Sequence, residues 1–212
     1  MSLRVDVRKL DLFNSIAKEG SETVAGHLEQ LTGLDAGVRT TQINFLDIED
    51  VKTHIGSERR VGIYVRLEEP PHGYVLFLLD PADSKRLVAA MLGTEPGDVD
   101  EGFSDMERSA MQEIGNILTS AFIDGWANVL RTTIDMGTPN FAIGPANGVV
   151  DKMGGWPDSD LVFVINAEIV TGDGDLGMTA YTFPELPALV ELIQDIDLDT
   201  DVVADSTADD VV

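Results

Sequence analysis

The sequence predicts an α+β fold built from two copies of one unit, helix-strand-strand-strand-helix. Each unit closes with a short helix that begins with proline, at Pro81 and at Pro184. A strand ends just before each proline, at Leu79 and Thr182, and a long helix opens each unit. A repeat of about 100 residues predicts duplication. We therefore expect one shared antiparallel sheet, flanked by two long helices that a pseudo-twofold axis relates.

The first unit covers about residues 8–93. Apolar residues at helical spacing predict a long helix from Arg8 to about Leu34. Strict alternation of apolar and polar residues predicts a strand over 60–67. Together with the other apolar runs, the pattern gives three strands and a short helix, over 40–51, 60–67, 74–79 and 81–92. An acidic linker over 93–102 then leads to the second unit.

The second unit covers about residues 103–194. Its long helix, Ser104–Arg131, opens with Ser104 and Glu107, the spacing of a capping box. The remaining elements are three strands, a loop and a short helix, over 132–143, 161–170, 176–183, 147–160 and 184–193. We expect residues 1–194 to form a single domain. The last stretch, 195–212, is rich in Asp and has no basic residue, which predicts a flexible acidic tail.

The long helix of the second unit has an apolar face and a polar stripe. Its predicted core face holds Ala110, Met111, Ile114, Ile117, Leu118, Ala121 and Phe122. Ser109, Glu113, Asn116 and Ser120 follow one another at spacings of four, three and four, so they are stacked neighbours on one side of the helix. The stripe therefore places a carboxylate and a carboxamide on a rigid support.

Composition excludes several classes of protein. The formal net charge is −24 and no basic patch exists, which excludes nucleic-acid binding by counterion release. No apolar run is long enough for a membrane span, and the N-terminal stretch lacks the apolar run of a signal peptide. There is no Cys, so disulfides, thiolate metal sites and cysteine nucleophiles are excluded. We expect a cytoplasmic protein without membrane insertion.

The charge imbalance itself has two interpretations. Fourteen Lys and Arg stand against thirty-eight Asp and Glu, spread along the whole chain. Concentrated salt screens the repulsion that such a surface creates, which favours a halophilic, archaeal source. An ordinary acidic protein from a dilute cytoplasm is the alternative. We favour the halophilic interpretation, because solubility alone rarely needs this much charge.

Few residues offer metal or nucleophile chemistry. His27, His54 and His72 have no metal-ligand spacing, so we interpret each as a surface or capping residue and expect no metal site. The acidic stretch 171–175 resembles part of a calcium loop but lacks the distal Glu, which favours a turn. No glycine-rich nucleotide loop or nucleophilic serine elbow is present. The polar stripe of the second long helix remains the candidate site.

That stripe belongs to a longer pattern. Glu113-x-x-Asn116 alone is a weak signal, since most such pairs are a solvated helix face. The full spacing, Ser109-x3-Glu113-x2-Asn116-x22-Pro139, matches the signature of the CheC/CheX/FliY family. The helix text MQEIGNILTSAF, Met111–Phe122, also resembles that family, as does LDLFNSIAKEGSETVAGHL in the first helix. The resemblance covers nearly the whole chain except the tail, and it is closest to CheC of a haloarchaeal type.

The resemblance implies a chemotaxis phosphatase that acts on the phosphoaspartate of the response regulator CheY. Glu113 and Asn116 would then project into the receiver's active site, which supplies a lysine and Mg²⁺, so no cofactor of its own is expected. A neutral carboxamide suits Asn116 to orienting a water in line with phosphorus, and Glu113 would bind a receiver cation. Ser109 and Pro139 support the motif. Pro139 would interrupt a strand and shape its edge.

The first unit departs from the family pattern. CheC proteins commonly carry a second Glu-x-x-Asn, but Ser15 and Lys18 stand at the corresponding positions. Neither residue supplies the carboxylate and carboxamide pair, so we expect one active helix. An alternative from another functional class remains open: a CheC-like adaptor that binds CheD or a receiver with little or no hydrolysis. The sequence leaves the cognate receiver, the rate, CheD binding and the oligomeric state undecided.

Overall fold

A computed structural model describes residues 9–154, 161–172, 174 and 176–196. The first half contains, in order, α1 (Leu10–Thr32), β1 (Ala36–Asp47), α2 (Ile48–Ile55), β2 (Arg59–Leu67), β3 (Gly73–Leu79) and α3 (Pro81–Leu92). The second half contains α4 (Asp105–Leu130), β4 (Asn140–Pro145), α5 (Ala146–Met153), β5 (Leu161–Thr171), β6 (Gly177–Phe183) and α6 (Leu186–Asp195). The two halves therefore repeat one order of elements, and the predicted tail lies outside the described residues, apart from its first two positions.

The strands form one sheet in the order β1-β5-β6-β3-β2-β4. Every neighbouring pair is antiparallel, which confirms the predicted shared antiparallel sheet. The counterparts in the two halves are β1 and β4, β2 and β5, and β3 and β6. Replacing each strand by its counterpart gives the same sheet, read from the opposite edge. The strand order is thus compatible with a pseudo-twofold relation between the halves, and the axis itself stays a prediction. β1 and β4 are the two edge strands.

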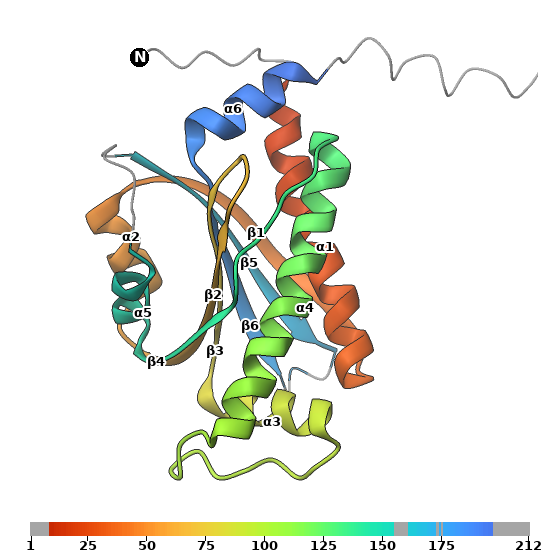
Figure 1. Cartoon of the computed structure of the whole chain (residues 1–212), viewed down its shortest axis with the longest axis vertical. Coiled ribbons are helices and arrows are strands. Elements are labelled where there is room, and N and C mark those ends of the chain that lie inside the picture. Colours follow the sequence, from red (N-terminus) through yellow and green to blue (C-terminus); the bar gives the residue numbers. More distant parts are fainter. Residues whose placement is uncertain (1–8, 155–160, 173, 175, 197–212) are drawn as a thin grey trace, which may run out of the picture.

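Helices α1 and α4 lie side by side along one face of the sheet (Figure 1). Their approach depends on glycine: a Cβ atom at Gly125 would lie 2.8 Å from the carbonyl oxygen of Glu19 on α1. Likewise, a Cβ atom at Gly115 would lie 2.3 Å from a methyl group of Ile63 on β2, so α4 rests directly on the sheet. These contacts hold α4 close to both the neighbouring helix and the strand below it.

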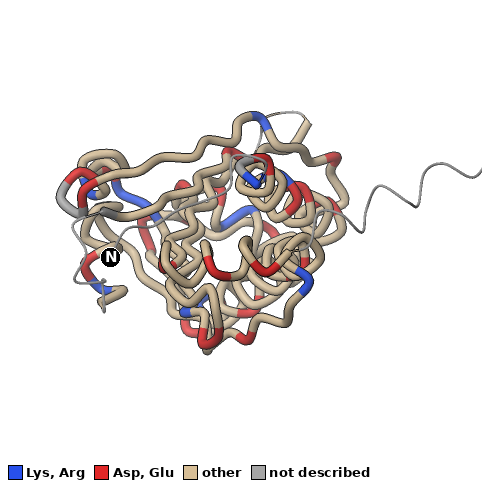
Figure 2. Tube along the Cα trace, turned by 90° about the horizontal axis from the view of Figure 1, so that it is seen from above, with Lys and Arg blue, Asp and Glu red and all other residues tan. Residues whose placement is uncertain are grey.

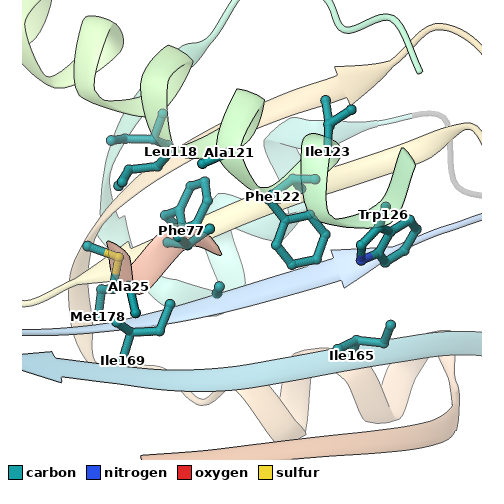
Figure 3. Close-up of a cluster of buried hydrophobic side chains, with 14 of the residues drawn as sticks. Ala25, Phe77, Leu118, Ala121, Phe122, Ile123, Trp126, Ile165, Ile169 and Met178 are labelled. Atoms are coloured by element: carbon teal, nitrogen blue, oxygen red, sulfur yellow. The ribbon is translucent and has the colours of Figure 1, made fainter. Parts of the chain in front are cut away.

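The main core lies between these two helices and the sheet, and it draws on both halves. Phe77, Phe122, Trp126 and Ile165 illustrate it, with side chains from β3, α4 and β5 in one cluster (Figure 3). The predicted core face of α4 is buried except at Ile117, which is half-buried. Burial of apolar side chains on this scale is the main force that holds the two long helices on the sheet.

Two short helices, which the sequence analysis missed, cover the opposite face of the sheet. The predicted strand over 40–51 ends at Asp47, and α2 follows it. The predicted loop over 147–160 begins as helix α5. Both are eight-residue helices whose buried residues include Val51, Val149, Val150 and Met153. Tertiary burial, rather than a long periodic pattern, stabilises such short helices.

The start of α4 is fixed by a capping box and a buried ion pair. Ser104 and Glu107 form the predicted reciprocal cap. The ammonium of Lys85 on α3, only 3% exposed, lies 2.6 Å from a carboxylate oxygen of Glu107 and above the ring of Phe103. Burial alone would raise the pKa of Glu107, but hydrogen bonds from Lys85 and Ser104 lower it. The N-terminal turn of α4 is therefore tied to α3.

Acidic residues are spread over the surface rather than gathered on one face. Seen from above, Asp and Glu positions surround the fold, with Lys and Arg scattered among them (Figure 2). Two ion pairs in the described part of the chain join side chains that are both exposed, Lys18 with Glu22 and Arg39 with Glu168. Exposed pairs of this kind stabilise a fold only slightly. No helix among the described residues is long and apolar enough to cross a membrane.

Candidate functional site

The residues of the sequence motif line one open depression beside α4. Ser109, Glu113 and Asn116 form the side that belongs to the helix, and the depression has a volume of about 640 Å³. Ser109 and Glu113 are exposed, whereas Asn116 is half-buried. Both residues of the predicted polar stripe therefore lie outside the core, and Asn116 is the more enclosed of the two. Their side chains are held by a helix that packs on the sheet, so the carboxylate and carboxamide have a rigid support.

Residues 136–139, the wall segment, form the other side together with Glu68. The chain leaves α4 through Arg131, which has a left-handed backbone (φ 52°), and returns along the edge of β2. An isolated bridge joins Met136 to Leu67, and the amide of Gly137 donates to the carbonyl of Arg66 at 2.9 Å. The wall segment is therefore attached to the end of β2.

Pro139 stands where the pairing of β4 with β2 is interrupted. The predicted strand over 132–143 is shorter in the structure, because regular pairing begins only at Asn140, opposite Tyr64. Before that point only the isolated bridge at Met136 remains. Proline has no backbone N–H to contribute to a ladder, which accounts for the gap. Pro139 itself is buried, and it lines the depression together with Glu113 and Asn116.

Two further residues of the depression were missed by the sequence analysis. The side-chain amide of Gln112 donates to the carbonyl oxygen of Pro139 at 3.0 Å, across from α4 to the wall segment. Glu68, exposed at the end of β2, contributes a carboxylate to the same depression. Gln112 directly precedes Glu113 in the sequence, and this position beside a motif residue was the available signal. Nothing local in the sequence marks Glu68, since only the pairing of β2 with the wall segment brings it to the site.

The described lining of the depression has acidic and neutral polar groups and no cation. The lining residues include the carboxylates of Glu68 and Glu113 and the carboxamides of Gln112 and Asn116, and none is Lys, Arg or His. Within the described residues, no group of three or more His, Asp or Glu has the geometry to hold a metal ion. The arrangement is therefore suited to receiving a cationic group from a partner and to orienting a small polar molecule such as water.

Among the residues that the structure describes, α1 carries no equivalent site. Ser15 is half-buried and its hydroxyl donates to the carbonyl of Asp11, while Lys18 is exposed and paired with Glu22 at 3.7 Å. A second depression, of about 600 Å³, lies at the start of β1 and the end of β5. Its described lining comes from residues 35–39, 170–172 and 174 and includes no residue of α1.

The three histidines, which the structure describes, do not gather into a site. His27 is half-buried, and its ring nitrogen Nδ1 lies 3.0 Å from the carbonyl of Thr23. His54 is exposed and contacts the ring of Tyr181 edge-on, and His72 has a left-handed backbone in a turn. In the acidic stretch 171–175, Asp173 and Asp175 lie outside the described residues.

Comparison with known proteins identifies the family. The model of the CheC-like family matches residues 106–143, which cover α4, the wall segment and the start of β4. A Halobacterium salinarum protein named "Putative CheY-P phosphatase CheC1" is 40% identical over 199 residues, covering 92% of this chain and 100% of the relative. The chain belongs to the CheC-like family. The haloarchaeal relative also agrees with the halophilic interpretation of the composition.

Solved structures support the same fold. FliY from Thermotoga maritima has a TM-score of 0.65 at 19% identity, covering 90% of this chain and 96% of its own. CheX from a Desulfovibrio desulfuricans subspecies has a TM-score of 0.55 at 15% identity, covering 79% and 97%. A chain of the FliM–SpeE complex from H. pylori has a TM-score of 0.63 at 13% identity, covering 90% of this chain and 95% of its own. At these identities the likeness concerns the fold of this CheC-like protein.

Proposed function

We propose that this CheC-like protein is a phosphatase that accelerates hydrolysis of the phosphoaspartate of a CheY-type receiver. One observation carries the proposal: Glu113 and Asn116 on α4 and the distant Pro139 of the wall segment line a single open depression. The name of the Halobacterium salinarum relative supports the same activity. Hydrolysis of a phosphoryl group depends mainly on positioning and electrostatics, which fixed polar side chains can provide.

Asn116 is the residue assigned to the reaction itself. Its carboxamide both donates and accepts hydrogen bonds, so it can orient a water molecule in line with phosphorus. Because the group is neutral, it does not repel the anionic phosphoryl group. Its half-buried position on a packed helix limits the number of orientations that the side chain can adopt.

Glu113 is assigned to recognition of the receiver. Its side chain is exposed and lines the depression, and none of the described lining residues is a cation. A receiver that carries a lysine beside its phosphorylation site would provide the missing cation. Mg²⁺ would also come from the receiver, so the protein would need no cofactor of its own. The acidic groups then attract the receiver's cation, while neutral Asn116 faces the phosphoryl group.

The decisive experiment measures decay of a phosphorylated receiver with and without this protein. A CheY-type receiver from a haloarchaeon is phosphorylated with acetyl phosphate, freed of excess donor, and followed at molar salt. We expect a decay rate that rises with the amount of protein added. An unchanged decay rate, with the protein folded and at several-fold excess, would contradict the proposal.

The adaptor function is the second candidate, and the loss of the motif on α1 favours it. Ser15 and Lys18 replace the carboxylate and carboxamide in the first half, so one helix is left free for binding without catalysis. Such a protein would bind a receiver or CheD and leave the decay rate unchanged. A pull-down with each partner, run beside the decay assay, separates the two functions.

A further inference from the structure

The wall segment is attached to the rest of the molecule in two different ways. At Met136 and Gly137 it is held by backbone pairing with the end of β2. At Pro139 that pairing is absent, because proline has no N–H and regular pairing starts again only at Asn140. The depression is thus bordered by a stretch of edge strand that the ladder does not hold.

The side chain of Gln112 replaces the missing attachment. Its amide nitrogen Nε2 donates to the carbonyl oxygen of Pro139 at 3.0 Å, and both residues line the depression. Pro139 is a buried residue, and a buried carbonyl group needs a hydrogen-bond donor. Gln112 supplies that donor. The bond spans from α4 to the wall segment, and Gln112 directly precedes Glu113 in the helix.

We propose that Gln112 is a positioning residue, which sets the shape of the depression by holding Pro139 against α4. The proposal rests on the proposed function, since the depression is taken as the place where the receiver docks. It also gives the motif proline a physical role. Proline stops the ladder, and its carbonyl is then available to a side chain of the catalytic helix.

The two sides of the depression should respond differently to loss of this hydrogen bond. α4 is held independently of Gln112, because Gly115 rests on Ile63 and Gly125 on α1. Asn116 therefore keeps its place when the bond is removed. The wall segment loses its contact at Pro139 and moves more freely. Receiver recognition should weaken, while the chemical step should be nearly unchanged.

The test uses two substitutions of similar size, Gln112→Met and Gln112→Glu. Methionine lacks the donor, and an ionised glutamate places a carboxylate against the carbonyl oxygen of Pro139. We expect KM for the phosphorylated receiver to rise about five- to tenfold in Gln112→Met and further in Gln112→Glu, with kcat within about twofold. Gln30→Met, at an exposed position on α1, is the matched control and should behave as the wild type.

A second measurement uses the protein alone. Hydrogen–deuterium exchange over residues 135–141 should become faster in both variants and stay unchanged in the control, with exchange in α4 unaffected. The proposal is wrong if the exchange rates and KM of both variants equal those of the wild type. It is also wrong if kcat falls while KM stays unchanged. If the wild type failed to accelerate decay, the proposed function would be wrong, and the exchange data would still decide whether Gln112 holds Pro139.

Discussion

The two long helices of this protein occupy equivalent places in the chain but have different surroundings. Three residues, Gly33–Asp35, connect α1 to β1, which then pairs with β5 from Ala36 to Asp47. Nine residues, 131–139, connect α4 to β4, whose regular pairing with β2 covers only 140–145. Beside α1 the ladder is nearly continuous, whereas beside α4 it is interrupted at Pro139.

Among the described residues, this difference accompanies a candidate site on α4 and none on α1, which also lacks the carboxylate and carboxamide pair. The interruption leaves room between α4 and the sheet edge, and the polar stripe of α4 opens into that room. In the first half the hollow at the corresponding strand ends includes no residue of α1. We therefore predict that a Glu-x-x-Asn pair on a helix acts only where the neighbouring edge strand is open beside it.

The largest effect is expected for Asn116→Ala. Removing a fixed polar group that orients the reacting water should lower the catalysed decay rate by about 100-fold or more. The side chain lies outside the core, so the free energy of unfolding should change by only about 0.5 kcal/mol. Phosphoryl-receiver decay and thermal melting measure the two quantities. Full activity in this variant would remove Asn116 from the mechanism.

A smaller effect is expected from the two carboxylates of the depression. Glu113→Gln and Glu68→Gln should each raise KM for the receiver up to about tenfold, because each removes one charge that attracts its cation. The loss should shrink at high salt, since these groups are exposed. Glu69→Gln is the control, because Glu69 is exposed and adjacent in sequence but does not line the depression. Equal effects at Glu68 and Glu69 would indicate a general charge effect.

Elements that depend on local patterns could be predicted from the sequence, and those that depend on tertiary contacts could not. α3 spans Pro81–Leu92 as expected, because a proline in the first turn and a glycine after the end mark both boundaries. α2 and α5 were missed, since eight-residue helices owe their stability to burial against the sheet. In the candidate site, helical spacing predicts that Glu113 and Asn116 share one side of α4, and the longer motif singles them out. Glu68 could not be predicted, because strand pairing alone brings it there.

Salt is expected to act on both halves together. One core contains residues from both halves, so they should unfold in a single transition. Lowering the salt concentration from about 3 M to about 0.1 M lengthens the screening distance to about 10 Å and exposes the repulsion of a net charge of −24. We expect the melting temperature to fall by several degrees. A melting temperature independent of salt would argue against the halophilic interpretation.

The smallest effect is expected when the Glu-x-x-Asn motif is introduced on α1, the helix that lacks it. The double substitution Ser15→Glu and Lys18→Asn would recreate Glu-x-x-Asn on α1, at positions that are half-buried and exposed. If the open edge beside α4 is essential, this variant combined with Asn116→Ala should hydrolyse the receiver no faster than Asn116→Ala alone. The single changes Ser15→Ala and Lys18→Ala should leave the decay rate within about twofold of the wild type, since Lys18 has only an exposed ion pair.

Activity regained by the grafted helix would contradict the comparison between the halves. It would show that the carboxylate and carboxamide pair suffices wherever a long helix presents it, and that the interruption at Pro139 has another purpose. Continued inactivity needs a control for binding, because a graft that cannot dock would also be inactive. A titration with a receiver activated by beryllofluoride provides that control. If the graft binds the receiver without hydrolysing it, the inactivity of α1 comes from the geometry beside that helix. It does not come from a failure of the receiver to reach the helix.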